Sequence, residues 1–143
     1  MDDLEQLYQD LLIDHYRHPR NKAGLRDEDV LAEEENPLCG DQIRLTARRD
    51  EQGRIVSVQH DGKGCAISQA SASMMTEALQ GKTVAEVEAL IERFVQAMRG
   101  EVDFDDQLPE DLHALRGVRS FPMRIKCATL GWHAMERILR QWQ

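Results

Sequence analysis

The chain has 143 residues, with 18 basic and 26 acidic side chains and a formal net charge of −8. This length fits one domain over residues 1–143, large enough to bury a core without disulfide staples. The negative charge argues against nonspecific binding to nucleic acid or to an acidic membrane, because both require a basic face.

Two features of the sequence bear on location. No stretch approaches the roughly 20 apolar residues of a membrane span, and the acidic first residues do not resemble a signal peptide. We therefore expect a cytoplasmic protein that binds neither nucleic acid nor a membrane. Three cysteines cannot all pair within one chain. A reducing compartment would keep them as thiols, which favours metal binding or sulfur chemistry over a disulfide framework.

The first predicted element is an amphipathic helix. Its stripe recurs every three or four residues, at Leu4, Leu7, Tyr8, Leu11, Leu12 and His15. Pro19 ends the helix, because the residue before a proline is pushed out of the helical region. His15 continues the stripe, which favours a core or partner-facing role over a metal role. The basic tract Arg17, Arg20 and Lys22 is either a solvated surface or a docking edge for an acidic partner.

A solvated connector and a hairpin follow. Residues 27–35 are acidic and poor in aromatic side chains, which predicts a solvated connector. Ile43, Leu45 and Ala47 alternate with polar residues, the pattern of a half-buried strand. Turn residues at 50–53 and the apolar residues of 55–58 predict the returning strand of a hairpin.

Residues from 66 onwards are predicted to form several helices. Residues 66–79 are rich in small side chains, and Gly81 is placed to end that helix. Thr83 with Glu86 forms a capping box for the next helix, which Gly100 ends. Pro109 suits the start of a short helix through Leu115, and Pro122 opens the last helix. The order predicts an α+β fold, a small antiparallel sheet of about three strands packed against several helices.

The three cysteines have unusual neighbours. Cys39 precedes Gly40 and Asp41, Cys65 follows Gly64, and Cys127 follows two cationic side chains. Glycines expose a thiolate and cations lower its pKa, and the thiolate is the reactive form. We expect the cysteines to lie before the first strand, after the hairpin and near the start of the last helix. Such element ends can converge at one edge of a small sheet.

Together with Asp41 the cysteines could form a zinc site. Zinc accepts four ligands in a tetrahedron, and thiolates and carboxylates both serve. In an extended segment Cys39 and Asp41 would point to the same side. Three thiolates and one carboxylate leave a site charge of −2, which Arg124 and Lys126 could offset. The alternative is three unrelated buried thiols, a common fate of free cysteine.

Four segments resemble one known family. They are residues 7–21, residues 36–41, residues 64–75 and residues 121–130, the last reading Phe-Pro-Met-Arg-Ile-Lys-Cys-Ala-Thr-Leu. They are similar, in order and over nearly the whole chain, to the IscU/NifU N-terminal superfamily, and within it to the SufU branch. Isc-type scaffolds carry histidine immediately before the last cysteine, where this chain has Lys126. The extra stretch at 100–117 also resembles SufU-type proteins.

The resemblance implies an IscU/NifU N-terminal-like fold and a zinc-dependent sulfurtransferase. Such proteins accept persulfide sulfur from a PLP-dependent cysteine desulfurase (SufS-type) and pass it to downstream iron–sulfur assembly proteins. Carried over by motif, the zinc ligands would be Cys39, Asp41, Cys65 and Cys127. Cys39 would also be the catalytic acceptor thiol.

Two other functions use the same residues. A scaffold could assemble and transfer a [2Fe–2S] cluster on the three thiolates, although Lys126 in place of histidine disfavours it, because protonated lysine is a poor ligand. A purely structural zinc site is the third possibility. The sequence leaves open the native metal, the downstream sulfur acceptor, the oligomeric state and the affinity for the desulfurase.

Overall fold

The computed structural model describes residues 3–22, 24–26 and 29–143. Its elements follow in the order α1 (Asp3–Arg17), β1 (Val30–Asn36), β2 (Asp41–Arg49), β3 (Ile55–Lys63), α2 (Ala66–Leu79), α3 (Val84–Met98), the 3₁₀ helix η1 (Glu110–Ser120) and α4 (Pro122–Gln141). This arrangement confirms the predicted α+β class, with one three-stranded sheet and several helices.

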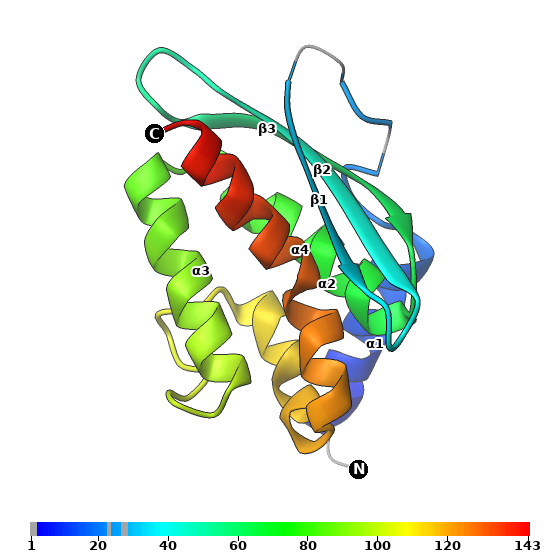
Figure 1. The fold of residues 1–143 in the computed structure, drawn as a ribbon. Helices are drawn as coiled ribbons and strands as arrows, with labels where there is room; N and C mark the ends of the chain where they lie inside the picture. The colour runs from blue at the N-terminus through cyan, green and yellow to red at the C-terminus, as the bar shows by residue number, and fades with distance from the viewer. Residues whose placement is uncertain (1–2, 23, 27–28) are drawn as a thin grey trace.

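The sheet is antiparallel and has the order β1-β2-β3. Ile43, Leu45 and Ala47 of β2 are fully buried, as their alternation predicts. Figure 1 shows the strands as one layer with the helices gathered on one side. α4 packs on β1 and β2, and α2 packs on β3. The helices therefore cover one face of the sheet and enclose the core against it.

The predicted connector at 27–35 is wrong over most of its length. Its first two positions lie outside the described residues, but Val30–Asn36 is the edge strand β1. Glutamates are depleted in strands, yet here Glu33 pairs with Arg44 at 2.9 Å and Glu34 pairs with Arg137 at 3.3 Å. These ion pairs place the acidic side chains on an edge, where charge also discourages pairing with another sheet. Cys39 consequently lies between two strands, not before the first.

The local signals for the middle helices are confirmed. Thr83 Oγ1 accepts the N–H of Glu86, and the Glu86 carboxylate accepts the N–H of Thr83, which completes the capping box of α3. The small residues of α2 allow α4 to approach closely, since a Cβ placed on Gly131 would contact Ala72. Trp132 of α4 stacks on Phe94 of α3 with ring centroids 4.2 Å apart. These contacts fix the direction of α4.

The bounds of α1 and η1 are close to those predicted from the sequence. α1 ends at Arg17, before Pro19, and packs on α2 and η1. The short helix predicted to stop at Leu115 continues as 3₁₀ structure to Ser120. Among the described residues, no helix combines the length and apolar character that crossing a membrane requires.

Candidate metal centre

Three of the four predicted ligands converge. The ligand atoms of Cys39, Asp41 and Cys127 all lie within 4.8 Å of one another. Cys39 lies in the connection between β1 and β2, Asp41 begins β2, and Cys127 lies in the second turn of α4. The packing of α4 against β1 and β2 therefore brings together residues that are 86 or more positions apart in sequence.

A tight turn, not an extended segment, places Cys39 beside Asp41. The N–H of Cys39 donates to Asn36 O at 3.2 Å, and Gly40 adopts a φ of +71°. That left-handed conformation favours glycine. The predicted extended conformation of this segment was thus wrong, although the ligand atoms of Cys39 and Asp41 do lie close together.

Cys65 joins the cluster through Asp41. It occupies the N-cap position of α2, and its N–H donates to Asp41 Oδ1 at 2.8 Å. Its Sγ lies 3.9 Å from Asp41 Oδ2, but it does not belong to the mutually close set of three. The positive end of the α2 dipole faces this thiol and the carboxylate, which favours negative charge on both.

Cys127 is the most enclosed of the thiols. It is fully buried, and the side-chain amide of Asn36 donates to its Sγ at 3.6 Å. Burial raises the pKa of Cys127 well above its ordinary value, helped by hydrogen bonds to Asp41 and Cys39 and by the negative charge of Cys65. A bound cation would favour the thiolate, because metal binding displaces thiol protons.

Of the two predicted cationic neighbours, Arg124 faces the thiols. The charge of Cys65 is the main cause that raises the pKa of Arg124, followed by a hydrogen bond to Cys127 and the charge of Cys39. Lys126 instead lines a surface hollow with Glu34, Glu35 and other residues of β1 and α4. Arg124 is therefore the side chain that offsets the negative charge of the cluster.

The donor set fits zinc. With Zn–S bonds of about 2.3 Å, two sulfur ligands of a tetrahedron lie roughly 3.8 Å apart. The donors here are already within 4.8 Å of one another, and Cys65 Sγ is 3.9 Å from Asp41 Oδ2. Cys65 lies outside the mutually close set, so its Sγ would have to move towards the other donors to complete the tetrahedron. The same thiolates also suit an iron–sulfur cluster.

Two residues that contact the ligands were given no role from the sequence. Asn36 donates to Cys127, and Ser68 Oγ lies 3.3 Å from Asp41 Oδ1. Both are almost completely buried. The signal that could have found them is their position, three residues before Cys39 and three residues after Cys65.

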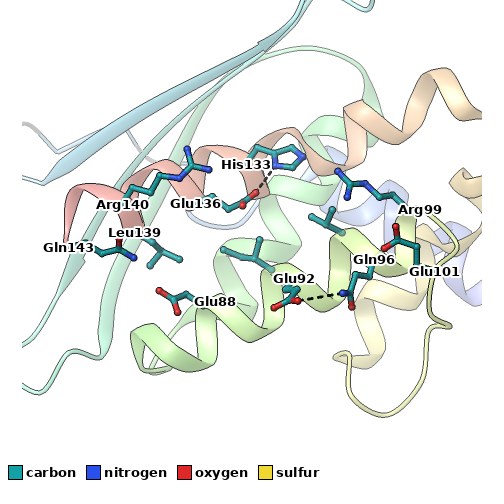
Figure 2. A pocket seen from close by; sticks show the side chains of 12 residues that line it. Glu88, Glu92, Gln96, Arg99, Glu101, His133, Glu136, Leu139, Arg140 and Gln143 are labelled. Carbon is teal, nitrogen blue, oxygen red and sulfur yellow. Dashed lines mark hydrogen bonds and ion pairs between the residues drawn. The ribbon is translucent and has the colours of Figure 1, made fainter.

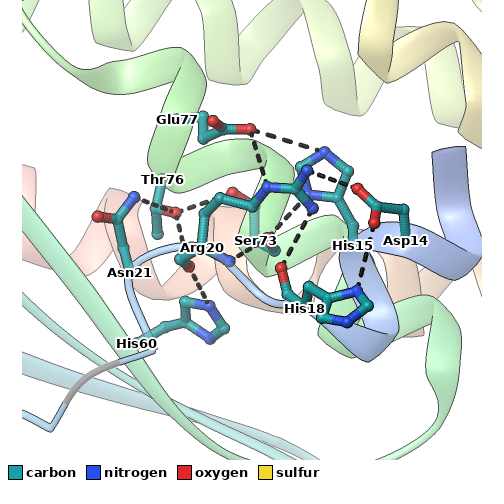
Figure 3. Close-up of polar contacts among 9 residues, drawn as sticks. All are labelled: Asp14, His15, His18, Arg20, Asn21, His60, Ser73, Thr76 and Glu77. Atoms are coloured by element: carbon teal, nitrogen blue, oxygen red, sulfur yellow. Dashed lines mark hydrogen bonds and ion pairs between the residues drawn. The ribbon is translucent and has the colours of Figure 1, made fainter.

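In a second cluster of possible ligands, His15, Glu77 and Asp111, the first two have structural partners. In Figure 3, Arg20 reaches Glu77 and Asp14, and His15 Nδ1 meets Ser73 Oγ at 2.8 Å. His15 is buried, as its place in the apolar stripe predicts.

Figure 2 shows a groove of about 490 Å³ between α3 and α4. Its polar side chains pair within each helix, for example His133 with Glu136 at 2.6 Å and Gln96 with Glu92 at 3.4 Å. None of the cysteines lines it. The chemistry therefore concentrates at the thiol cluster.

Comparison with known proteins identifies the family. The model of the NifU-like N terminal domain matches residues 7–142. The zinc-dependent sulfurtransferase SufU of Bacillus subtilis is 46% identical over 136 residues, which cover 94% of this chain and 90% of that protein. The iron–sulfur cluster assembly scaffold protein IscU of Streptococcus pyogenes is 36% identical over 138 residues, covering 96% and 86%.

A solved structure supports the same family assignment. A protein proposed as an iron–sulfur cluster assembly scaffold of the SUF system in Fervidobacterium islandicum superposes with a TM-score of 0.84 at 31% identity, covering 94% of this chain and 98% of that one. The chain belongs to the NifU-like N-terminal domain family of the IscU superfamily.

Proposed function

We propose that the chain is a zinc-dependent sulfurtransferase that accepts persulfide sulfur from a PLP-dependent cysteine desulfurase of SufS type for iron–sulfur cluster biogenesis. Cys39, Asp41, Cys65 and Cys127 are the proposed zinc ligands, and Cys39 is the acceptor. The observation that carries the proposal is the clustering of three donors within 4.8 Å, in a chain 46% identical to a zinc-dependent sulfurtransferase.

The surroundings of the thiols favour Cys39 as the acceptor. Cys127 is fully buried and held by Asn36, whereas Cys39 is partly exposed on a turn next to Gly40. Cys65 is also partly exposed, but it is fixed at the start of α2 by its bond to Asp41. Thiol exchange requires access to the attacking sulfur, which the turn position of Cys39 offers.

The transfer step balances without an added oxidant or reductant. The Cys39 thiolate attacks the outer sulfur of the donor's persulfide, the donor's S–S bond breaks, and the donor cysteine leaves as a thiolate. Cys39 then carries the persulfide. Bound zinc would keep the thiols deprotonated near neutral pH. Arg124 faces the site and would balance the negative charge that the attacking and leaving sulfurs bring together.

Exposed apolar side chains next to the ligands support contact with a protein donor. Leu38 precedes Cys39 and is 71% exposed, and Phe121 and Met123 at the start of α4 are 63% and 65% exposed. Apolar groups exposed beside a reactive site are typical of protein contact surfaces. The desulfurase and the downstream iron–sulfur assembly proteins are the proposed partners, in the cytoplasm.

The test follows labelled sulfur from the desulfurase. Cys39→Ala should accept no labelled sulfur, while wild-type protein is labelled and accelerates desulfurase turnover in a zinc-dependent way. Melting temperature and zinc content are measured on each sample, so that a loss of the fold is recognised. Labelling of Cys39→Ala at the normal rate would refute the acceptor assignment, and no acceleration by zinc-loaded wild type would refute the function.

A scaffold that assembles and transfers an iron–sulfur cluster is the second candidate. Its support is the name of relatives such as the IscU protein of Streptococcus pyogenes at 36% identity. Lys126, which lines the hollow beside β1, disfavours it. Purification without air should yield one zinc per chain and no acid-labile sulfide; stoichiometric iron and sulfide would favour the scaffold.

A further inference from the structure

We infer that Ser68 and the backbone N–H of Cys65 are positioning groups that hold one oxygen of Asp41, so that the carboxylate binds metal through the other oxygen alone. The inference rests on the proposed function, because it concerns the same site. It assigns different roles to the two carboxylate oxygens of Asp41: one accepts hydrogen bonds and the other binds the metal.

The two oxygens of Asp41 have different surroundings. Oδ1 accepts the N–H of Cys65 at 2.8 Å and faces the hydroxyl of Ser68 at 3.3 Å. These two donors fill its lone pairs, since a carboxylate oxygen has about two acceptor sites. Oδ2 lies 3.9 Å from Cys65 Sγ. Because the two donors occupy Oδ1, Oδ2 is the oxygen left to receive a cation.

The Ser68 hydroxyl has a second acceptor. It lies 3.0 Å from Cys65 O, which already accepts the N–H of Gln69 at 3.2 Å. Asp41 carries a negative charge, and hydrogen bonds to charged acceptors are roughly twice as strong as neutral ones. The carboxylate is therefore the preferred acceptor of the single hydroxyl proton.

Close packing leaves the carboxylate little freedom. Asp41 is 2% exposed and Ser68 is 1% exposed. A Cβ placed on Gly64 would fall on Asp41 Oδ1 and on Ser68 Oγ, so only glycine leaves the room that these oxygens occupy. Rotation that brought both oxygens towards a metal would break both hydrogen bonds.

The arrangement also stabilises α2. The N-cap residue Cys65 makes no side-chain cap of its own, and Asp41 supplies an acceptor from the neighbouring strand. A carboxylate near a helix N-terminus is favoured by the helix dipole. The same side chain thus caps α2 with one oxygen and offers the other to the metal.

The experiment measures zinc affinity by competition with a chromophoric chelator. Ser68→Ala should weaken zinc binding by about 10- to 100-fold, the usual effect of removing a group that orients a metal ligand. Ser68→Thr keeps the hydroxyl and should restore most of the affinity. Ser71→Ala is the matched control, because Ser71 is equally buried in α2 but bonds to Ala128 O and Trp132, away from Asp41.

A second measurement needs no variant. Wild-type protein loaded with Co²⁺ should show the intense visible absorption of a four-coordinate site. A weak five-coordinate spectrum would mean that both oxygens of Asp41 bind, and would overturn the inference.

The outcomes separate the two proposals. Zinc affinity of Ser68→Ala equal to that of wild type or of Ser71→Ala would overturn the inference and leave the sulfurtransferase function standing. Protein that shows the Ser68 effect but accepts no sulfur would refute the function alone. Wild type that binds neither metal would refute both.

Discussion

At the scale of single residues, surroundings make three identical thiols different. Cys127 is fully buried within α4, Cys65 occupies the N-cap position of α2, and Cys39 is partly exposed on a turn. The sequence shows the same side chain three times and gives only its neighbours. The burial and hydrogen bonding that distinguish Cys127 from the proposed acceptor Cys39 depend on the packing of distant segments.

Gly64 offers a direct test of the crowding around Asp41. Gly64→Ala should lower the free energy of unfolding of metal-free protein by about 3 to 4 kcal/mol, because its φ of +152° is strained for alanine and its Cβ meets two oxygens. Gly81→Ala is the matched control, with a φ of +77° and no atom within 4 Å of the added Cβ. It should cost about 1 to 2 kcal/mol. Equal losses in urea denaturation would show that no such crowding exists.

At the scale of elements, a polar network ties the segment after α1 to α2 and β3. Arg20 N donates to Ser73 Oγ at 2.8 Å, and Asn21 donates to Thr76 at 3.0 Å (Figure 3). Arg20 O lies 2.9 Å from His60 Nε2. A carbonyl can only accept, so the proton of His60 must be on Nε2. The ring of His60 on β3 is fully buried within this network.

The burial of His60 predicts a pH-dependent stability. Burial lowers the pKa of His60 to about 4; the hydrogen bond to Arg20 O and the charge of Asp61 act against this shift, and the charge of Lys22 adds to it. Between pH 6.5 and 4 the unfolded chain binds more protons than the folded one, so stability falls as the pH falls. The loss should be about 3 kcal/mol by pH 4 in metal-free protein.

His60→Gln provides the variant for this test. Glutamine keeps an N–H for Arg20 O but does not titrate, so urea denaturation should show a shallower fall in its unfolding free energy over the same pH range. Burial also lowers the pKa of His15, which adds to the effect in both proteins. A variant as pH-sensitive as wild type would contradict the assignment to His60.

At the scale of the whole molecule, the proposed ligands join three regions. They come from the β1–β2 turn with the start of β2, from the start of α2 and from α4. Metal binding there would cross-link the end of the sheet to two helices. Metal occupancy would thus be coupled to the stability of the complete fold.

Removal of zinc should therefore lower the melting temperature. With free zinc at 1,000 times the dissociation constant, binding stabilises the folded state by about 4 kcal/mol, which corresponds to roughly 10 °C for a chain of this size. Differential scanning calorimetry with and without a chelator measures the shift, and magnesium serves as the control ion. An unchanged melting temperature would argue against zinc at this site.

Structural features that depend on residues close together in the chain could be predicted from the sequence alone. The capping box at Thr83 and Glu86, the hairpin around 50–53 and the α2 range need only contacts within a few residues, so local patterns found them. The resemblance to the family also pointed to the four proposed ligands, of which Cys39, Asp41 and Cys127 lie within 4.8 Å of one another.

Features that depend on contacts between distant segments became visible only in the folded structure. β1 is held by Arg44 and Arg137, so its glutamates alone predicted a connector. The pairing of Asn36 with Cys127 requires β1 to meet α4, and the divided roles of the Asp41 oxygens require β2 to meet α2. These partners lie 11 to 104 positions apart in sequence, and the packing of distant segments brings them together, which no local pattern encodes.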